Sequence, residues 1–511
     1  MNTKINNRYF KPFFFTILIV NILVNSFFSA KFNILNSDSV WGNILLPEIF
    51  RSRIYLNLDT YLFHYPFTYI ASLFFGISNM AVFLNTFVLV LITLGTYSIF
   101  YIYFVHRYLG KQKFIYFLPL LFFINTSWGF YSNLAHPFIR NVEFGVVFLM
   151  AIYFNNLKKL HKNRVLAILT YLLLLLLLLS DPYFLYLFAI PLVMVLITKS
   201  SKGKEYAAAA KYVILSIIGY FIVFLFLNCL PYVVIFTRNP ALSNINGIIS
   251  NLTLFTHGML LLLSAQPRIN IFSIIEFGLF PIGIYGLYLL LKTYYKEHEI
   301  ISVLLPLCFC STIFAYLFSD VASGNIDTNR YLIFLFFILP LGLCFFLSKI
   351  NSPVFKKGFS FVLLILSIIN FVSLSTTFYQ AGTNNPYKKN YSIVNAVSKY
   401  GVNDGYTSYW NAAINTYISS NKSRFRQISC NNHHIYPYLW VSANRWYEVN
   451  NEITKNFILI DFTGNLTPEL KDCSLSDITQ QFGKPDRIVA IATNKGVFSL
   501  LLFNHNIAGK F

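Results

Sequence analysis

Two carboxylates and two arginines lie close together in the stretch "NSDSVWGNILLPEIFRSRIY" (36–55), directly after the first long apolar segment. The carboxylates are Asp38 and Glu48, and the arginines are Arg51 and Arg53. A carboxylate can take the proton of a hydroxyl group, and a guanidinium can hold two oxygens of a phosphate. The stretch therefore contains the side-chain types needed to transfer a group from a phosphate to a hydroxyl.

Asp38 is well placed to act as a base if Ser37 is the N-cap of a short helix that Pro47 ends. The positive end of a helix dipole favours the ionised form of an acid in the first turn. The alternative is that Asp38 only supports a surface helix. Glu48 is the second candidate, and Pro47 leaves its position relative to Asp38 open.

Arg140 and Arg330 are further candidates for gripping a phosphate, although each could instead anchor a helix at the membrane interface. His64 and His136 could assist as hydrogen-bond donors, whereas a lone histidine at an interface is more often structural. Asp181 precedes a proline in a tight turn and is predicted to be a turn residue.

The composition predicts that most of the chain lies in a bilayer, because 56% of its residues are hydrophobic and only 11% are charged. We predict about eleven transmembrane helices from apolar runs of suitable length. One acid, Glu276, lies inside such a run, where a charge is costly and usually faces a cavity or reaches water. The runs are 11–31, 79–105, 114–134, 142–157, 165–180, 183–198, 212–236, 271–291, 299–318, 331–348 and 359–377.

The basic residues of the loops predict the orientation of the chain. If the amino terminus is cytoplasmic, the cytoplasmic loops before residue 378 hold nineteen lysines and arginines and the opposite loops hold seven. The formal charge of +20 is therefore mainly a topology signal, and we expect no nucleic-acid partner because the cations are spread over short loops. The first run is predicted to be an uncleaved span, since Phe28 is too large for the small-residue pattern of a signal-peptide cleavage site.

The predicted cytoplasmic loops are short and contain three acids, with no glycine-rich phosphate loop and no Asp-x-Asp pair. A nucleotide site cannot be built from them. We therefore expect any chemistry on the exported side, where seven acids and seven cations fall at or beyond the ends of the spans. The segment 239–267 is predicted to be a re-entrant or surface helix on that side.

The tail, 378–511, is predicted to be a separate α/β domain, and 1–377 the transmembrane domain with its first outer loop at 32–78. Helices are expected at "YSIVNAVSKYG", "NAAINTYISSN" and "SLSDITQQFG". Strands are expected at "GYTSYW", "RFRQISC" and "NFILIDF", with a hairpin of "RIVAIAT" and "VFSLLLF".

Two sets of residues in the tail could have special roles. Aromatic faces stack on sugar rings, so an acceptor could bind to Tyr406, Trp410, Trp440 and Trp446, unless these residues fill the core or the membrane interface. Cys430 and Cys473 are the two cysteines of the exported tail, and they could form a disulfide or be two unrelated buried thiols. We predict no metal site.

The layout resembles the GT-C superfamily of polytopic membrane glycosyltransferases, and in plan it is most similar to the serotype-converting O-antigen glucosyltransferases of enteric bacteria. The resemblance covers the whole chain and rests on "NSDSVWGN", "YLFHYPFTYI", "HPFIRNVEFG", "SDPYFLYLFAIPL", "DTNRYL" and "GYTSYWNAAIN". Many members carry two adjacent acids at the start of the first outer loop, whereas here Ser37 and Ser39 flank Asp38. The resemblance therefore does not fix the base or a divalent metal.

This resemblance implies a helical membrane protein of the bacterial inner membrane that transfers a sugar, glucose by analogy, from a polyprenyl phosphate. The acceptor would be the O-antigen or another surface glycan on the periplasmic side, with Asp38 as catalytic base. The partners would be the lipid-phosphate sugar, the glycan acceptor and membrane lipid. A flippase or polymerase for lipid-linked glycans, or a transporter, is the competing class, although a transporter should show corresponding halves that are not evident here.

Overall fold

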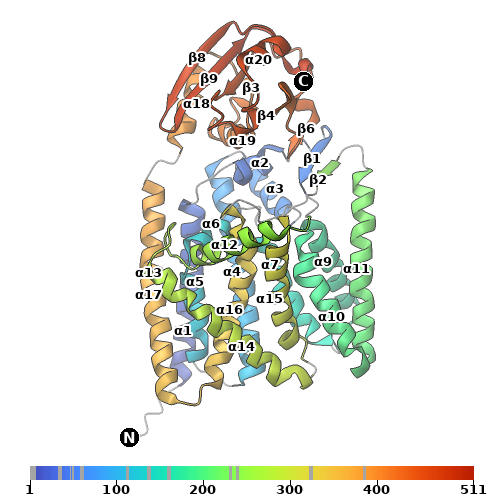
Figure 1. The fold of residues 1–511 in the computed structure, drawn as a ribbon, viewed down its shortest axis with the longest axis vertical. Coiled ribbons are helices and arrows are strands. Elements are labelled where there is room, and N and C mark those ends of the chain that lie inside the picture. Colours follow the sequence, from blue (N-terminus) through green and yellow to red (C-terminus); the bar gives the residue numbers. More distant parts are fainter. Residues whose placement is uncertain are drawn as a thin grey trace.

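The computed structural model is a bundle of long helices with a smaller sheet-containing domain at one end (Figure 1). We call the end that carries this domain the domain end, and the opposite end the far end. Helix α1 (Asn7–Phe32) begins at the far end, and the carboxyl terminus lies in the sheet-containing domain. The structure describes residues 7–32, 37–45, 48, 51–57, 63–76, 78–110, 114–134, 140–157, 163–229, 233–236, 241–297, 299–320, 326–383 and 387–511.

Each of the eleven predicted apolar runs falls on one or more helices of the bundle. Nine helical segments in the described residues are long and apolar enough to cross a membrane, or ten if the bent pair 114–125 and 128–134 is one span. One of the nine, Ile245–Leu262, lies outside the predicted runs, whereas the helices in the runs 142–157 and 165–180 are too short to count, so the eleven predicted spans are too many for the described residues. Besides α1, the bundle contains α4 (Asn79–Leu109), η2 (Phe114–Phe117), α5 (Leu118–Asn125), α6 (Trp128–Leu134), α7 (Asn141–Phe154), α9 (Arg164–Ser180), η3 (Leu185–Ala189), α10 (Ile190–Lys199), α11 (Lys204–Asn228), α13 (Ile271–Phe277), α14 (Leu279–Tyr294), α15 (Ile301–Phe318), α16 (Ile333–Lys349) and α17 (Pro353–Thr383).

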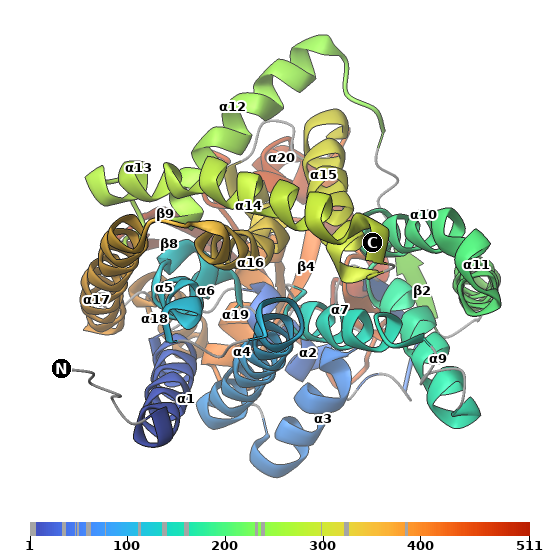
Figure 2. The ribbon, with the colours of Figure 1, turned by 90° about the horizontal axis from the view of Figure 1, so that it is seen from below.

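Two segments at the domain end depart from the regular pattern of spans. The run predicted at 212–236 is too long, because α11 ends at Asn228 and β2 (Val233–Phe236) is a strand. Its β-branched residues pair with another chain segment instead of continuing the helix. Helix α12 (Ile245–Leu262) lies across the other helices (Figures 1 and 2), in agreement with the surface or re-entrant helix predicted for 239–267.

Helix α16 is the most buried span, with 83% of its most apolar stretch covered by other parts of the chain. It contacts α14 closely because both helices carry glycine at the crossing. A Cβ atom on Gly286 would lie 1.9 Å from the carbonyl oxygen of Gly342, and one on Gly342 would lie 2.1 Å from that of Gly283. Small residues allow such close packing of membrane helices. A firmly packed α16 gives the segment before it, η7 (Ile326–Leu332), a fixed place at the domain end.

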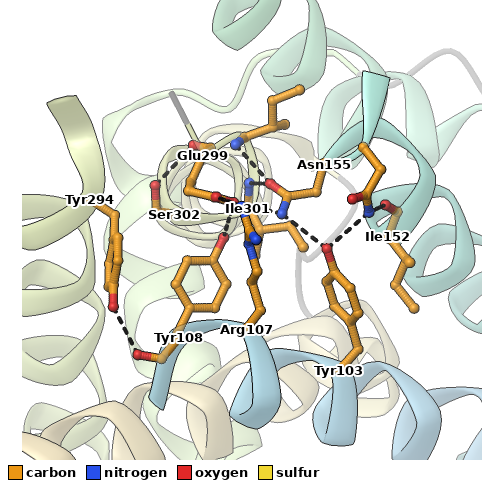
Figure 3. A network of polar contacts seen from close by, with 11 residues as sticks. Tyr103, Arg107, Tyr108, Ile152, Asn155, Tyr294, Glu299, Ile301 and Ser302 are labelled. Carbon is orange, nitrogen blue, oxygen red and sulfur yellow. Dashed lines mark hydrogen bonds and ion pairs between the residues drawn. The ribbon is translucent and has the colours of Figure 1, made fainter. Parts of the chain in front are cut away.

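A polar network joins three helices at the far end (Figure 3). Glu299 accepts a hydrogen bond from Arg107 of α4, and one of 2.7 Å from the Asn155 amide after α7. The Asn155 oxygen accepts hydrogen bonds from the backbone N–H groups of Ile300 and Ile301 at the start of α15, at 2.9 and 3.1 Å. The network therefore caps one helix while it ties that helix to two others.

The first segment after α1 joins the membrane bundle to the sheet-containing domain. A three-stranded sheet has the order β2-β1-β6, in which β1 is parallel to β2 and antiparallel to β6. The elements concerned are α2 (Ser37–Leu45), β1 (Ile54–Asn57), α3 (His64–Phe75) and β6 (Ser442–Ala443). Three segments far apart in the sequence are thus hydrogen-bonded at this junction.

The carboxyl-terminal domain contains a six-stranded mixed sheet of order β5-β4-β3-β7-β9-β8, with β3 parallel to β4 and β7. The expected helices and strands are confirmed, with one correction: β3 ends at Thr407 and α19 begins at Tyr409, so Trp410 is helical and not in a strand. The elements are α18 (Lys388–Lys399), β3 (Asp404–Thr407), α19 (Tyr409–Ile418), β4 (Arg424–Asn431), β5 (His434–Pro437), η8 (Asn444–Trp446), β7 (Asn456–Ile460), η9 (Pro468–Leu470), α20 (Leu475–Phe482), β8 (Arg487–Thr493), β9 (Gly496–Phe503) and η10 (Ala508–Lys510).

Helix α19 packs against α2 and so docks the sheet-containing domain on the first segment. An apolar cluster at this contact includes Val40 of α2 and Ile414 of α19. Ser37 Oγ donates a 2.8 Å hydrogen bond to the carbonyl oxygen of Tyr409, and α2 begins at this residue, one position earlier than the predicted N-cap implies. The contact fixes the place of the α2 backbone.

A disulfide joins Cys430 at the end of β4 to Cys473 before α20, with Cα atoms 5.8 Å apart. The bond closes a segment of the chain that includes β5, β6 and β7. Of the two alternatives left open by the sequence, the structure therefore has the disulfide, and the four remaining cysteines are free.

Candidate active site

A cluster of buried polar side chains lies at the domain end of the bundle. His64 begins α3, Glu143 is in the first turn of α7, and Ser180 and Asp181 end α9. Each of these four residues is at most 1% exposed. Arg140, which precedes α7, is 4% exposed. Burial of so many charges is costly, and in a membrane protein it commonly marks a functional site.

Glu143 occupies one half of this cluster. Ser180 Oγ donates a 2.6 Å hydrogen bond to Glu143 Oε1, and His64 Nε2 lies 3.4 Å from Glu143 Oε2. The carboxylate also lies in the first turn of α7, near the positive end of the helix dipole. The position of Glu143 thus allows it to orient the histidine or to accept a hydrogen bond from a substrate.

Arg140 occupies the other half and forms an ion pair with Asp181. Asp181 also accepts a 2.9 Å hydrogen bond from the backbone N–H of Tyr183, which is the turn geometry predicted for it. The backbone of Arg140 is left-handed (φ 40°), a conformation that costs free energy for a residue with a Cβ atom. Such strain persists where the surroundings impose it, and it is concentrated at functional sites.

The guanidinium of Arg140 lies between two tyrosine rings, 4.8 Å from the centroid of Tyr183 and 4.6 Å from that of Tyr331. The guanidinium of Arg330 lies 5.2 Å from the same Tyr331 centroid and 3.5 Å from its hydroxyl group. Tyr183 in turn donates a 2.8 Å hydrogen bond to the Tyr331 carbonyl oxygen. The fold therefore brings two of the four predicted phosphate-binding arginines to one tyrosine.

The other two arginines of the prediction lie elsewhere. Arg51 and Arg53 are exposed, and among the described residues they form no hydrogen bond or ion pair with the cluster around Arg140. The guanidinium of Arg53 lies 5.7 Å from the ring centroid of Tyr55, and its carbonyl oxygen accepts a hydrogen bond from Asn444. They border the junction between the bundle and the sheet-containing domain.

The two predicted acids of the first outer loop differ in what the structure describes. The backbone of Asp38 is in α2, directly at the contact with α19, and its side chain lies outside the described residues. Glu48 is 8% exposed and pairs with Arg445 of the carboxyl-terminal domain at 2.6 Å. A carboxylate held in this way is less available as a base.

The four predicted acceptor-binding aromatics do not form one surface. Tyr406 and Trp446 line a common pocket, and the Tyr406 hydroxyl donates a 3.4 Å hydrogen bond to the Trp446 carbonyl oxygen. Trp410 is 47% exposed and contacts the ring of Tyr409, whereas Trp440 is half-buried beside the α2–α19 contact. Neither of these two lines the pocket.

Reasoning from the sequence missed the roles of Glu143 and Ser180 and treated His64 and Asp181 as structural. The signal available was weak: each is a polar residue at the end of an apolar run, and partners lie on different helices. His136 and the side chain of Asp327 lie outside the described residues. Within the described ranges, no three histidine, cysteine or acidic side chains are grouped as a metal site would need.

Glu276, the acid inside a span, is fully buried between α13 and α17, where it accepts a hydrogen bond from the Asn370 amide. It borders a small apolar cavity of about 20 Å³ together with Phe280 and Leu339. Its side chain therefore faces the interior of the bundle and does not reach water at the end of the helix.

The bundle, the short domain-end elements and the terminal sheet-containing domain together form a GT-C fold, as the sequence predicted. The chain is similar to the crystal structure of ArnT from Cupriavidus metallidurans in the apo state, with a TM-score of 0.55 and 9% identity over 96% of this chain and 98% of that chain. A structure of ArnT from the same organism bound to undecaprenyl phosphate gives a TM-score of 0.49 and 10% identity over 95% and 97% of the two chains. The sequence matches no protein-family model and no curated protein.

Proposed function

We propose that the protein is a glycosyltransferase that moves a sugar, glucose by resemblance, from a polyprenyl phosphate to a surface glycan such as the O-antigen. The proposal places the domain end on the periplasmic side of the bacterial inner membrane, in line with the nineteen-to-seven distribution of cations. It is supported by the GT-C fold over nearly the whole chain and by the buried Arg140 with the half-buried Arg330 at the domain end.

The observation that carries the proposal is the convergence of Arg140 and Arg330 on Tyr331. A guanidinium has five N–H donors in a fixed plane that matches the oxygens of a phosphate, and the Arg140 guanidinium is also held by its ion pair with Asp181. Two guanidinium groups near one point can neutralise the charge that develops on a departing phosphate. Arg51 and Arg53 lie at the junction with the sheet-containing domain. They would contact only the parts of the donor or acceptor that extend beyond the cluster around Arg140.

The reaction requires a base beside the anomeric carbon of the donor sugar. The acceptor hydroxyl oxygen forms a bond to this carbon, its proton passes to a carboxylate, and the bond from carbon to phosphate oxygen breaks to release polyprenyl phosphate. We assign the base to Asp38, at the start of α2, with Glu48 second because Arg445 already neutralises it. Glu143 is a third carboxylate of the site, and we propose that it holds the His64 ring in place instead of acting as the base.

The test is a transfer assay with the full-length protein in vesicles and a polyprenyl-phosphate sugar. We expect Asp38→Asn to abolish transfer, because an amide cannot take the proton, while the affinity for the donor is kept. Ser39→Ala is the matched control on the same helix and should transfer normally. Unchanged transfer by Asp38→Asn would remove Asp38 from the mechanism.

The competing proposal, a flippase or polymerase for lipid-linked glycans, predicts a different result in the same vesicles. A flippase would move the lipid-linked sugar between leaflets without making a new glycosidic bond. Addition of a single sugar to the acceptor, detected by mass spectrometry and dependent on the arginines of the domain end, supports the transferase. Joining of whole lipid-linked repeat units would instead support a polymerase. Movement of lipid with no new bond from any donor and acceptor pair supports the competing class.

A further inference from the structure

The carboxyl-terminal domain contains a polar pocket that is separate from the cluster around Arg140. It has a volume of about 270 Å³ and lies at the beginning of the parallel strands β3 and β4. Pockets for small organic ligands begin at about 300 Å³, whereas one water takes up about 30 Å³. The pocket is therefore much larger than a simple ion needs, and it lies near the lower end of the range for small organic ligands, which suits one sugar unit.

Three arginines line this pocket, and two of them have carboxylate partners. Arg424 pairs with Asp404 at 2.6 Å, and Arg445 pairs with Glu48 of the first outer segment at 2.6 Å. Arg426 forms no ion pair or hydrogen bond with the described residues, and its guanidinium lies 4.4 Å from the ring centroid of Trp446. The wall thus contains one cation, Arg426, whose charge is not neutralised by direct contact, and one further carboxylate, Glu448, which accepts a hydrogen bond from the Asn444 amide.

Burial lowers the pKa of Arg426 to about 10, and the nearby Asp404 carboxylate partly opposes this effect. The guanidinium is still charged at neutral pH, since this value is well above 7. A charged group that is held half-buried without a paired anion is unfavourable in the free protein. An anionic ligand would remove this cost, so the position is suited to bind an anion.

The aromatic residues of the wall add a second requirement. The guanidinium of Arg426 lies over the ring of Trp446, which restricts its movement, and the ring of Tyr406 is stacked on the ring of Tyr447. A fixed planar guanidinium favours ligands whose oxygens lie in one plane, such as a carboxylate, or two oxygens of a phosphate. Aromatic walls next to such a group are typical of sites for sugars that carry a charge.

We propose that this pocket binds an acidic sugar unit of the acceptor glycan, with its carboxylate or phosphate held by Arg424, Arg426 and Arg445. The identity of the ligand as the acceptor rests on the proposed transferase function. Binding would also give Arg445 a second anionic partner beside Glu48. The bound acceptor would thereby change the ion pair that connects Arg445 to the first outer segment, which includes α2. The pocket thereby links recognition of the glycan to the segment that carries Asp38.

The test measures binding of an oligosaccharide to the purified full-length protein in detergent, without any donor. The probes are a short oligosaccharide that contains glucuronate, one that contains a sugar phosphate, the same length of neutral glucan, and inorganic phosphate alone. We expect at least one acidic oligosaccharide to bind, and Arg426→Gln to weaken it by about tenfold or more because a charge-assisted contact is lost. The neutral glucan should bind more weakly and should not respond to the substitution.

Arg487→Gln is the matched control, because Arg487 is an exposed arginine of β8 that stacks on the ring of Tyr400 at 5.0 Å in the same domain. It should leave binding unchanged, and both variants should unfold at the temperature of the natural protein. Any of three results would overturn the proposal. Acidic and neutral oligosaccharides could bind with equal affinity, Arg426→Gln could bind the acidic oligosaccharide as tightly as the natural protein does, or inorganic phosphate could be the only probe that binds. Because no donor is present, this test measures binding independently of transfer. Binding of an acidic oligosaccharide here, together with no transfer in the vesicle assay with donor, would refute the transferase and leave the pocket intact.

Discussion

The polar networks at the two ends of the bundle use the same residue types in different ways. At the far end, Glu299 is paired with Arg107, whose side chain is 51% exposed, and Asn155 caps the start of α15 (Figure 3). At the domain end, Arg140 and Asp181 are 4% and 1% exposed, and Arg140 has a strained backbone. The far-end network ties helices together at low cost, whereas the domain-end cluster keeps charges buried at a high cost that stability alone does not explain.

The difference separates a structural use of charge from a functional one. An ion pair that reaches water contributes little to stability, and loss of either partner is tolerated. A buried pair is strongly coupled, since removal of one partner leaves the other charge uncompensated. We therefore expect substitutions at the domain end to affect both transfer and stability, and those at the far end to affect stability only slightly.

The largest effect is expected for Arg140→Ala. It leaves Asp181 buried without its cation, which costs about 3–5 kcal/mol of stability, and it removes the phosphate-binding group of the proposed site. Thermal unfolding in detergent and donor binding in vesicles measure the two effects separately. Arg140→Lys should recover most of the stability but not donor affinity, because an ammonium cannot form the planar two-point contact. Normal donor binding by both variants would remove Arg140 from the site.

An intermediate effect is expected for Asn155→Ala at the far end. The substitution removes the oxygen that accepts from Ile300 and Ile301, and loss of a helix cap costs about 1 kcal/mol. Unfolding should therefore occur at a slightly lower temperature, and transfer per folded molecule should be unchanged. A fall in transfer as large as that of Arg140→Ala would mean that the two ends are coupled and that the comparison fails.

The smallest effect is expected for Arg107→Ala. Its half-exposed guanidinium pairs with Glu299 at the edge of the bundle, so the loss should be at most about 1 kcal/mol. Raising the salt concentration should reduce the difference between variant and natural protein further. A destabilisation of several kcal/mol would show that the far-end pair is as tightly coupled as the Arg140–Asp181 pair.

Much of the fold could be predicted from the sequence, because its signals are local. A run such as 331–348 has a length and apolar content that only a membrane-spanning helix satisfies, and α16 occupies it. The short β-rich runs 487–493 and 497–503 predicted the hairpin of β8 and β9, and the turn lies at Asn494 and Lys495. The failures were at boundaries: β2 was included in the span 212–236, and Trp410 was placed in a strand, because pairing partners far along the chain decide these positions.

The sequence by itself determined which segments enter the membrane, which cysteines were available to pair, and which residue types stand at the ends of the helices. Only the tertiary structure decided that Arg140 and Arg330 share Tyr331, while Arg51 and Arg53 do not join them. Likewise, only folding brought Glu48 to Arg445, which lies 397 residues further along the chain. The physical reason is that burial of an apolar run depends on neighbouring residues alone, whereas a charge is neutralised by whichever distant group the packing of other helices places beside it.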